Sequence, residues 1–193
     1  MGWEYVNNYD LSNITFRNNS NIQSVDGLFH NWSNSSLEYA FENCTNLIYT
    51  MNINHNVVSI NYAYKNCSNL VVYPDISNNT KIKYMSGTFC GCNKITSAPT
   101  IPNSVITIDK AFDGCTNLTG DIFIHSNEIT NAIDCFNNTS IAKNVYIPFT
   151  YQNGDNTATY NAFIEAEYSA SIRKNGVLLK DLNEYWINNN IWY

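Results

Sequence analysis

Apolar residues recur along this chain in a fixed order and at fixed spacing. The repeated unit reads apolar, two residues, apolar, three residues, aromatic, two residues, cysteine, two residues, leucine, as in the segment 105–118 around Phe112 and Cys115. Further copies centre on Phe41 and Cys44, Tyr64 and Cys67, Phe89 and Cys92, and more weakly Phe136. The aromatic positions lie 23 to 25 residues apart, and a self-similar period of this length predicts a solenoid in which each repeat forms one coil.

The residue two places after each aromatic predicts the local structure of the coil. It is always asparagine or glycine, at Asn43, Asn66, Gly91, Gly114 and Asn138. These two residue types enter the left-handed region of backbone space most cheaply and commonly end a helix. We therefore expect a repeat solenoid with short parallel β-strands, such as 104–108 and 122–124, and one helical turn per coil that stops at this residue.

The cysteines have the spacing of a structural ladder. Four of them follow a repeat aromatic by three residues, so in a stack their side chains point the same way. A disulfide needs Cβ atoms that converge, and zinc needs a tetrahedron of ligands rather than a line. We expect buried thiols that act as small hydrophobic side chains. Cys90 and Cys92 are the one close pair, and only Cys92 belongs to the ladder.

The chain divides into three predicted parts. Residues 1–28 form an N-terminal cap, 29–147 hold the repeats, and 148–193 form a C-terminal α+β cap. We find no copy of the unit in residues 1–21. The first unit is compressed, because Phe29 precedes the next repeat aromatic by only 12 residues and a tryptophan takes the place of the cysteine. Such a unit suits the end of a stack, which must cover one open face.

The C-terminal cap has its own pattern. It predicts a final strand at 144–148, a helix at 157–167 with Phe163 on its apolar face, and a hairpin turn at 175–176, an Asn-Gly pair. The tail is unusually aromatic. Its residues either cover the last coil or anchor another subunit, since Trp and Tyr are favoured in interface hot spots. The candidate binding residues of the tail are Tyr185, Trp186, Trp192 and Tyr193.

Composition excludes several function classes. The net charge of −6 leaves little to attract phosphate, so nucleic acid is not an expected partner. No apolar run approaches the roughly 20 residues of a transmembrane helix, so we expect no membrane insertion. The first residues lack the basic and apolar regions of a signal peptide. If Met1 is the natural start, we expect the protein to leave its cell only by lysis.

The sequence offers little catalytic chemistry. The three histidines have no partner at triad or metal-ligand spacing, and Asp109, Asp113 and Asp121 match no calcium loop. A glycan hydrolase would need two carboxylates facing each other across a cleft, which a narrow solenoid rarely supplies. We predict no catalytic residue, no cofactor and no metal, and keep a glycan-acting enzyme only as an alternative.

The repeat resembles a known family. The segment 101–118 reads IPNSVITIDKAFDGCTNL, and this pattern resembles the BspA-type leucine-rich repeats; the segment 83–92, KYMSGTFCGC, looks like a sister version. The resemblance covers residues 22–147 and implies a solenoid that adheres to host proteins or cell surfaces. The segment 146–182 looks like the cap that follows such repeats in proteins of gut bacteriophages and their hosts.

These observations favour a non-catalytic binding or structural module. The resemblance implies a virion component, such as a fibre, tail or capsid-decoration protein, that binds a protein, a cell-surface glycan or other virion proteins and that could form homo-oligomers. The alternative is an adhesin domain of a bacterial surface or secreted protein. Recognition is expected from the residues that differ between copies directly after each aromatic, namely Glu42, Lys65, Cys90, Asp113 and Asn137.

Overall fold

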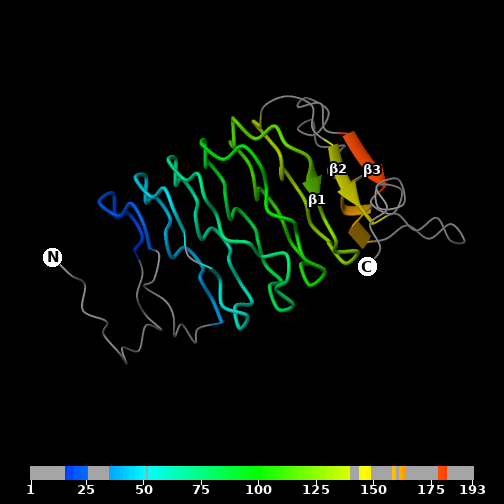
Figure 1. Ribbon diagram of the computed structural model, residues 1–193. Helices are drawn as coiled ribbons and strands as arrows, with labels where there is room; N and C mark the ends of the chain where they lie inside the picture. Colours follow the sequence, from blue (N-terminus) through cyan, green and yellow to red (C-terminus); the bar gives the residue numbers. More distant parts are fainter. Residues whose placement is uncertain are drawn as a thin grey trace, which may run out of the picture.

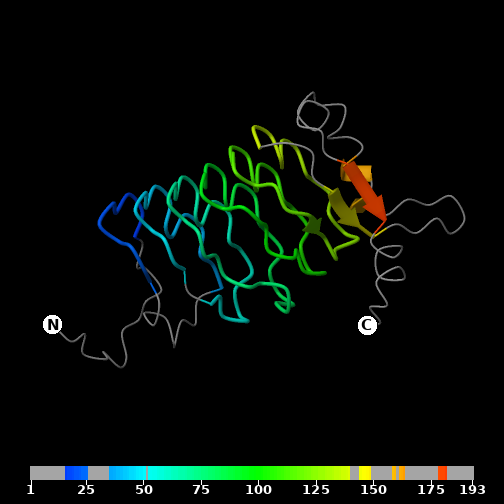
Figure 2. The same ribbon diagram turned by 45° about the horizontal axis from the view of Figure 1, so that its top comes forward.

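The chain forms a solenoid of stacked coils in a computed structural model, and three strands lie at the C-terminal end of the stack (Figure 1). The structure describes residues 16–25, 35–50, 52–139, 144–148, 158–159, 161–163 and 178–181. Successive coils lie side by side in both views (Figures 1 and 2). The repeat period read from the sequence is thus the length of one coil.

The repeat aromatics form a continuous stack of rings through the core. Ring centroids on successive coils lie 5.3 to 6.3 Å apart, and their planes are within 15° of parallel. Such offset stacking adds to the hydrophobic gain from burying large apolar rings. The described rings, in order, are Phe16, Phe41, Tyr64, Phe89, Phe112, Phe136 and Phe163. Leucine, isoleucine and valine of the repeat surround this stack and are also buried.

Each ring lies in a corner of its coil, the segment 37–44 in the coil of Phe41. The backbone amides of this corner donate alternately to carbonyls of the next coil and to carbonyls of their own coil. Leu37, Tyr39, Phe41 and Asn43 donate their amide hydrogens to carbonyls of the following coil at 2.8 to 3.0 Å. Ala40, Glu42 and Cys44 donate instead to the carbonyl three positions earlier in their own coil, at 3.0 to 3.1 Å. The same alternation recurs in the coils of Tyr64, Phe89 and Phe112.

This alternation requires two left-handed residues per coil. The predicted one, two places after the ring, is confirmed in all five copies, with φ between 53° and 75°. A second lies two places before the ring, with φ between 53° and 60°. The members of this second set are Tyr39, Tyr62, Gly87, Lys110 and Asp134.

The prediction of one helical turn per coil is wrong for the described coils. An α-helix closes its hydrogen bonds over four residues, whereas these corners close theirs over three. The closures from Ala40 to Leu37 and from Cys44 to Phe41 have a positive φ at their third residue and are β-turns of the type II kind, whereas the closure from Glu42 to Tyr39 has the ring residue at that position. Two left-handed residues within five interrupt any helical run.

The β-structure is mostly reduced to single parallel bridges. One column of bridges joins Ser24, Tyr49 and Val72, and another joins Ser36, Ser59, Tyr84, Thr107 and Asn131. Among the described residues, longer strands occur only at the C-terminal end. They are β1 (Ile122–Phe123), β2 (Asn144–Ile147) and β3 (Leu178–Asp181), in the order β1-β2-β3 and parallel throughout. The predicted strand at 104–108 is a single bridge, whereas those at 122–124 and 144–148 are largely confirmed.

The cysteine ladder is confirmed as a set of thiols. Each ladder thiol donates to the carbonyl of the repeat aromatic on the preceding coil, as Cys67 does to Phe41 at 3.0 Å and Cys92 does to Tyr64 at 3.0 Å. All six cysteines of the chain lie in the described residues, and no disulfide joins them. Burial raises the pKa of Cys67 and Cys92, so both thiols stay protonated.

The stack begins with a ring that the sequence analysis missed. Phe16 stacks on Phe41, and the expectation that residues 1–21 hold no copy is therefore wrong. The segment 16–22, FRNNSNI, follows the downstream half of the unit with Asn19 in the place of the cysteine. The division at residues 28 and 147 stays a prediction, and Phe29 lies outside the described residues.

At the C-terminal end the stack is continued by a helical segment. Residues 158–159 and 161–163 are helical, and the rest of the predicted helix at 157–167 lies outside the described residues, as does the hairpin turn at 175–176. Phe163 is fully buried against the last repeat ring, Phe136. Thr159 accepts from the Ile129 amide at 3.0 Å and donates to the Ser126 carbonyl at 2.7 Å, which ties this segment to the preceding coil.

Replacing a ring in the middle of the stack should destabilise the whole solenoid. Phe112→Ala removes a fully buried ring between two others and should lower the free energy of unfolding by about 3–5 kcal/mol. Urea denaturation measures the change. Thr116→Ala, at an exposed position of the same coil, is the control and should change stability by less than about 0.5 kcal/mol. Equal stability of the two variants would contradict the stacked core.

Candidate functional site

The turn corners form one long surface, which we call the turn face. It consists of the residue after each ring and the residue two places before it. Residues at one position of successive coils lie one beside another, so these two positions make parallel rows along the stack. The first row is Arg17, Glu42, Lys65, Cys90, Asp113 and Asn137, and the second is Tyr39, Tyr62, Gly87, Lys110 and Asp134.

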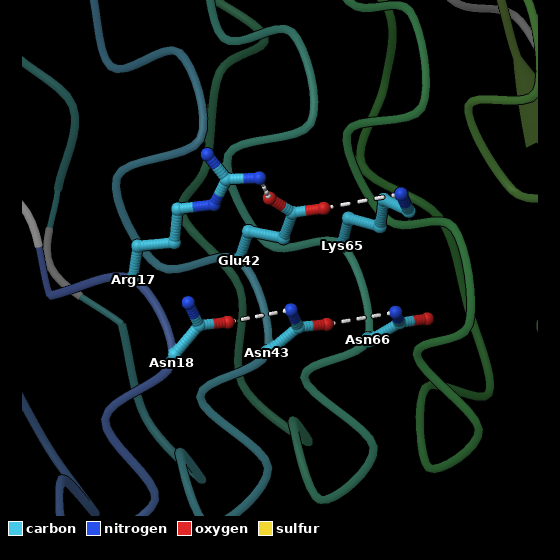
Figure 3. A network of polar contacts seen from close by, with 6 residues as sticks. All are labelled: Arg17, Asn18, Glu42, Asn43, Lys65 and Asn66. Carbon is cyan, nitrogen blue, oxygen red and sulfur yellow. Dashed lines mark hydrogen bonds and ion pairs between the residues drawn. The ribbon is translucent and has the colours of Figure 1, made fainter.

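A buried carboxylate joins the first three coils of the turn face. One oxygen of Glu42 lies 2.6 Å from Arg17 Nη2 and the other 3.1 Å from Lys65 Nζ, as the upper row of Figure 3 shows. Glu42 is only 4% exposed, because the two cations cover it. The expectation that Glu42 itself reads a partner is therefore wrong: its carboxylate holds Arg17 and Lys65 in place.

Two tyrosines on the second row complete this cluster. The rings of Tyr39 and Tyr62 stack at 5.0 Å with planes 8° apart. The guanidinium of Arg17 lies 5.2 Å from the centre of the Tyr39 ring, and Lys65 Nζ lies 5.6 Å from that of Tyr62, both within cation–π range. The Tyr62 ring lies where a side chain at Gly87 would be, since a Cβ there would come within 2.2 Å of Tyr62 Cε1. Only glycine fits beneath this ring.

An asparagine ladder runs beside the ion pairs. Asn43 donates its side-chain amide to Asn18 Oδ1 at 2.7 Å, and Asn66 donates to Asn43 Oδ1 at 2.8 Å, as the lower row of Figure 3 shows. The ladder ends at the next coil, where a Cβ on Gly91 would lie 2.5 Å from Asn66 Oδ1. The left-handed asparagines thus connect the coils with their side chains as well as with their backbone.

The aspartates of the C-terminal half also join neighbouring coils. Asp109 accepts from the Ile133 amide at 2.9 Å, and Asp113 accepts from the side-chain amide of Asn138 at 3.2 Å. Burial raises the pKa of Asp109, and the hydrogen bond from Ile133 opposes that shift. Asp121 accepts from the Asn144 side chain at 2.9 Å. In the described part of the chain, no three His, Cys, Asp or Glu side chains are placed to hold a metal ion.

The residues that the sequence singled out are distributed between the turn face, the core and the undescribed tail. Cys90, Asp113 and Asn137 lie on the turn face and are partly exposed, as is Lys65. The repeat rings and ladder cysteines lie in the core. The aromatic tail lies outside the described residues, so its candidates, Tyr185, Trp186, Trp192 and Tyr193, stay a prediction. Within the described ranges, no helix is long and apolar enough to cross a membrane.

Sequence reasoning missed three members of the cluster, Arg17, Tyr39 and Tyr62. Arg17 was missed because its coil was not recognised. A signal for the tyrosines was present, because both copies place tyrosine two residues before the ring, in the segments 39–41 and 62–64. This signal does not by itself predict the turn, because tyrosine rarely adopts a left-handed conformation.

Comparison with known families gives one match. The model of the BspA type leucine rich repeat region matches six copies, over residues 6–97 and 35–165, which together make up more than half of the chain. No curated protein and no solved structure matches the chain.

The Lys65–Glu42 pair should stabilise the folded state at neutral pH and lose this effect at alkaline pH. The hydrogen bond that Lys65 donates to Glu42 raises the pKa of Lys65 above the ordinary 10.5, so the folded state favours the charged lysine. This stabilisation is complete below the pKa of lysine in the unfolded chain and is lost as the pH rises through the higher folded value. Below pH 10, Lys65→Met should unfold more easily than the natural chain by about 0.5 kcal/mol, the range of partly exposed ion pairs.

The free energies of unfolding of both proteins, measured in urea between pH 7 and pH 12, test this. The difference between them should shrink above the ordinary lysine pKa of 10.5. A difference that stays constant across this range would contradict the role given to the pair.

Proposed function

Because the chain belongs to the BspA-type leucine-rich repeat family, we propose that it is a binding module whose turn face recognises a protein partner. Repeats of this type are generally non-enzymatic and mediate protein binding. One observation carries the assignment to this face: a backbone that is the same in every coil presents side chains that differ from coil to coil. The core positions of the repeat lack this variation, because they must fill the same space in each coil.

The N-terminal half of the turn face has the composition of a binding hot spot. Tyrosine and arginine are enriched among residues that dominate binding energy. Here Tyr39 is 37% exposed and the Arg17 side chain 50% exposed, and both are held by stacking and by the buried Glu42. Side chains fixed in advance lose less conformational entropy on binding. The cluster therefore offers contact area at a small entropic cost.

Removing the exposed tyrosine of this cluster should weaken attachment. The test uses fluorescently labelled protein incubated with a panel of cultured gut bacteria and measured by flow cytometry. The natural protein should label at least one strain saturably, and Tyr39→Ala should bind that strain about 30-fold more weakly, equivalent to the roughly 2 kcal/mol of a hot-spot residue.

Tyr84→Ala is the matched control for this experiment. Tyr84 is 40% exposed, close to the value for Tyr39, but lies in a bridge column rather than on the turn face. Its variant should bind like the natural protein. The proposal fails if no strain is labelled saturably, or if both tyrosine variants bind equally well.

We propose that the protein is a bacteriophage virion component, such as a fibre, tail or capsid-decoration protein, that attaches the particle to a host surface. The support is the likeness of the segment 146–182 to caps in proteins of gut bacteriophages and their hosts. The aromatic tail, with Trp186 and Trp192, would then contact other virion proteins or a second copy of this chain. The alternative is an adhesin domain at a bacterial surface or in a secreted protein.

Mass spectrometry of purified particles distinguishes the two. Phage particles from a culture that carries this coding sequence should contain peptides of the protein at a constant ratio to the major capsid protein. Peptides found in the cell envelope or medium, and absent from washed particles, would support the adhesin and overturn the virion proposal.

A further inference from the structure

One coil is longer than its neighbours at a single turn. Six positions separate the buried residues Ile76 and Ile82, whereas four separate the equivalent pairs, Ile53 to Val57 and Ile101 to Val105. The two additional residues lie in the turn 77–81, which is therefore larger than the corresponding turns of the adjacent coils.

This enlarged turn borders a groove of about 360 Å³. The groove continues across the turn of the next coil to a histidine of the coil after it. Its lining residues are Ser77, Asn78, Asn79, Thr80, Pro102, Asn103, Ser104 and His125. None of these belongs to the turn face, so the groove is a separate feature of the surface.

Most residues that line the groove are polar and uncharged, and they include no acidic or basic side chain apart from the imidazole of His125. The charged residues that flank the turn are engaged elsewhere. Lys81 Nζ donates to Asn56 Oδ1 on the preceding coil at 3.1 Å, and Asp75 accepts from the Ser77 amide at 2.9 Å. Burial lowers the pKa of His125, which favours its neutral form at pH 7.

The frame of the groove is held by hydrogen bonds. The buried Asn79 accepts from the amides of Lys81 at 2.8 Å and Ile82 at 3.0 Å, and Ser104 Oγ donates to the Ile82 carbonyl at 2.7 Å. Two exposed amides, Asn78 and Asn103, make no side-chain hydrogen bond to another described residue. Small-ligand sites are usually pre-formed and carry a few placed polar groups, and the volume of the groove lies in their usual range of about 300–1,000 Å³.

We propose that this groove binds a neutral, hydroxyl-rich ligand, a hexose residue presented by a glycan. An asparagine side chain has both a hydrogen-bond donor and an acceptor, and so does a sugar hydroxyl. Asn78 and Asn103 can therefore each bind two neighbouring hydroxyls, by donating to one and accepting from the other. The half-buried imidazole of His125 supplies a surface against which the C–H groups of a sugar can pack. A charged ligand would lose water here without meeting an opposite charge, which is costly.

Nuclear magnetic resonance can test this with four separate probes: glucose, galactose, mannose and N-acetylglucosamine. Side-chain amide signals of Asn78 and Asn103 in ¹⁵N-labelled full-length protein should shift saturably with at least one sugar at millimolar concentration. Asn103→Ala and Asn78→Ala should each weaken that binding at least tenfold. Asn52→Ala, at an exposed asparagine outside the groove, should leave it unchanged.

The proposal is overturned if none of the four sugars gives a saturable shift at the groove. It is also overturned if Asn103→Ala and Asn78→Ala both bind as the natural protein does while their backbone spectra show a native fold, or if glucuronate binds more tightly than the neutral hexoses. Tyr39→Ala should retain the sugar-dependent shifts. The groove and the turn face can therefore fail independently of each other.

Discussion

The structure depends on the alternating hydrogen bonds at the corner of each coil. Every second amide, from Leu37 to Asn43 and at the equivalent positions of the following coils, donates to the next coil, and the residues between close β-turns within their own coil. This pattern places one aromatic ring at the equivalent position of every coil, so the rings of successive coils stack on one another. A left-handed residue costs about 1 kcal/mol or more outside glycine, and the bonds between coils offset that cost.

Part of this arrangement can be predicted from the sequence. The repeat period, the five rings from Phe41 to Phe136 and the left-handed asparagines and glycines are properties of single residue types and could be identified. The Phe16 ring was missed, because asparagine takes the place of the cysteine in its coil. The second left-handed position could not be identified, because Tyr39, Tyr62 and Lys110 have no preference for it and adopt it where hydrogen bonds to the next coil hold them there. The helical turn was wrong for the same reason, since hydrogen bonds between coils override local propensity.

The candidate site could likewise be predicted from the sequence only in part. The row of residues that differ between copies could be read from the alignment of the repeats. The burial of Glu42 could not, because it depends on Arg17 from a coil in which asparagine replaces the signature cysteine. The groove depends on two additional residues in one turn, whose effect becomes apparent only beside the shorter turns of adjacent coils. Both surface features arise from departures from the repeat, while the repeat itself builds the scaffold.

In the stacked solenoid, rings 23 to 25 residues apart in sequence are neighbours in space. Nuclear Overhauser contacts between ring protons, in protein labelled selectively at phenylalanine and tyrosine, measure this directly. The Phe112 ring should show contacts to both Phe89 and Phe136, whose centroids lie 5.6 and 5.7 Å away, and none to Phe41. A Phe112 ring without contacts to Phe89 and Phe136, or one in contact with Phe41, would contradict the stacked solenoid.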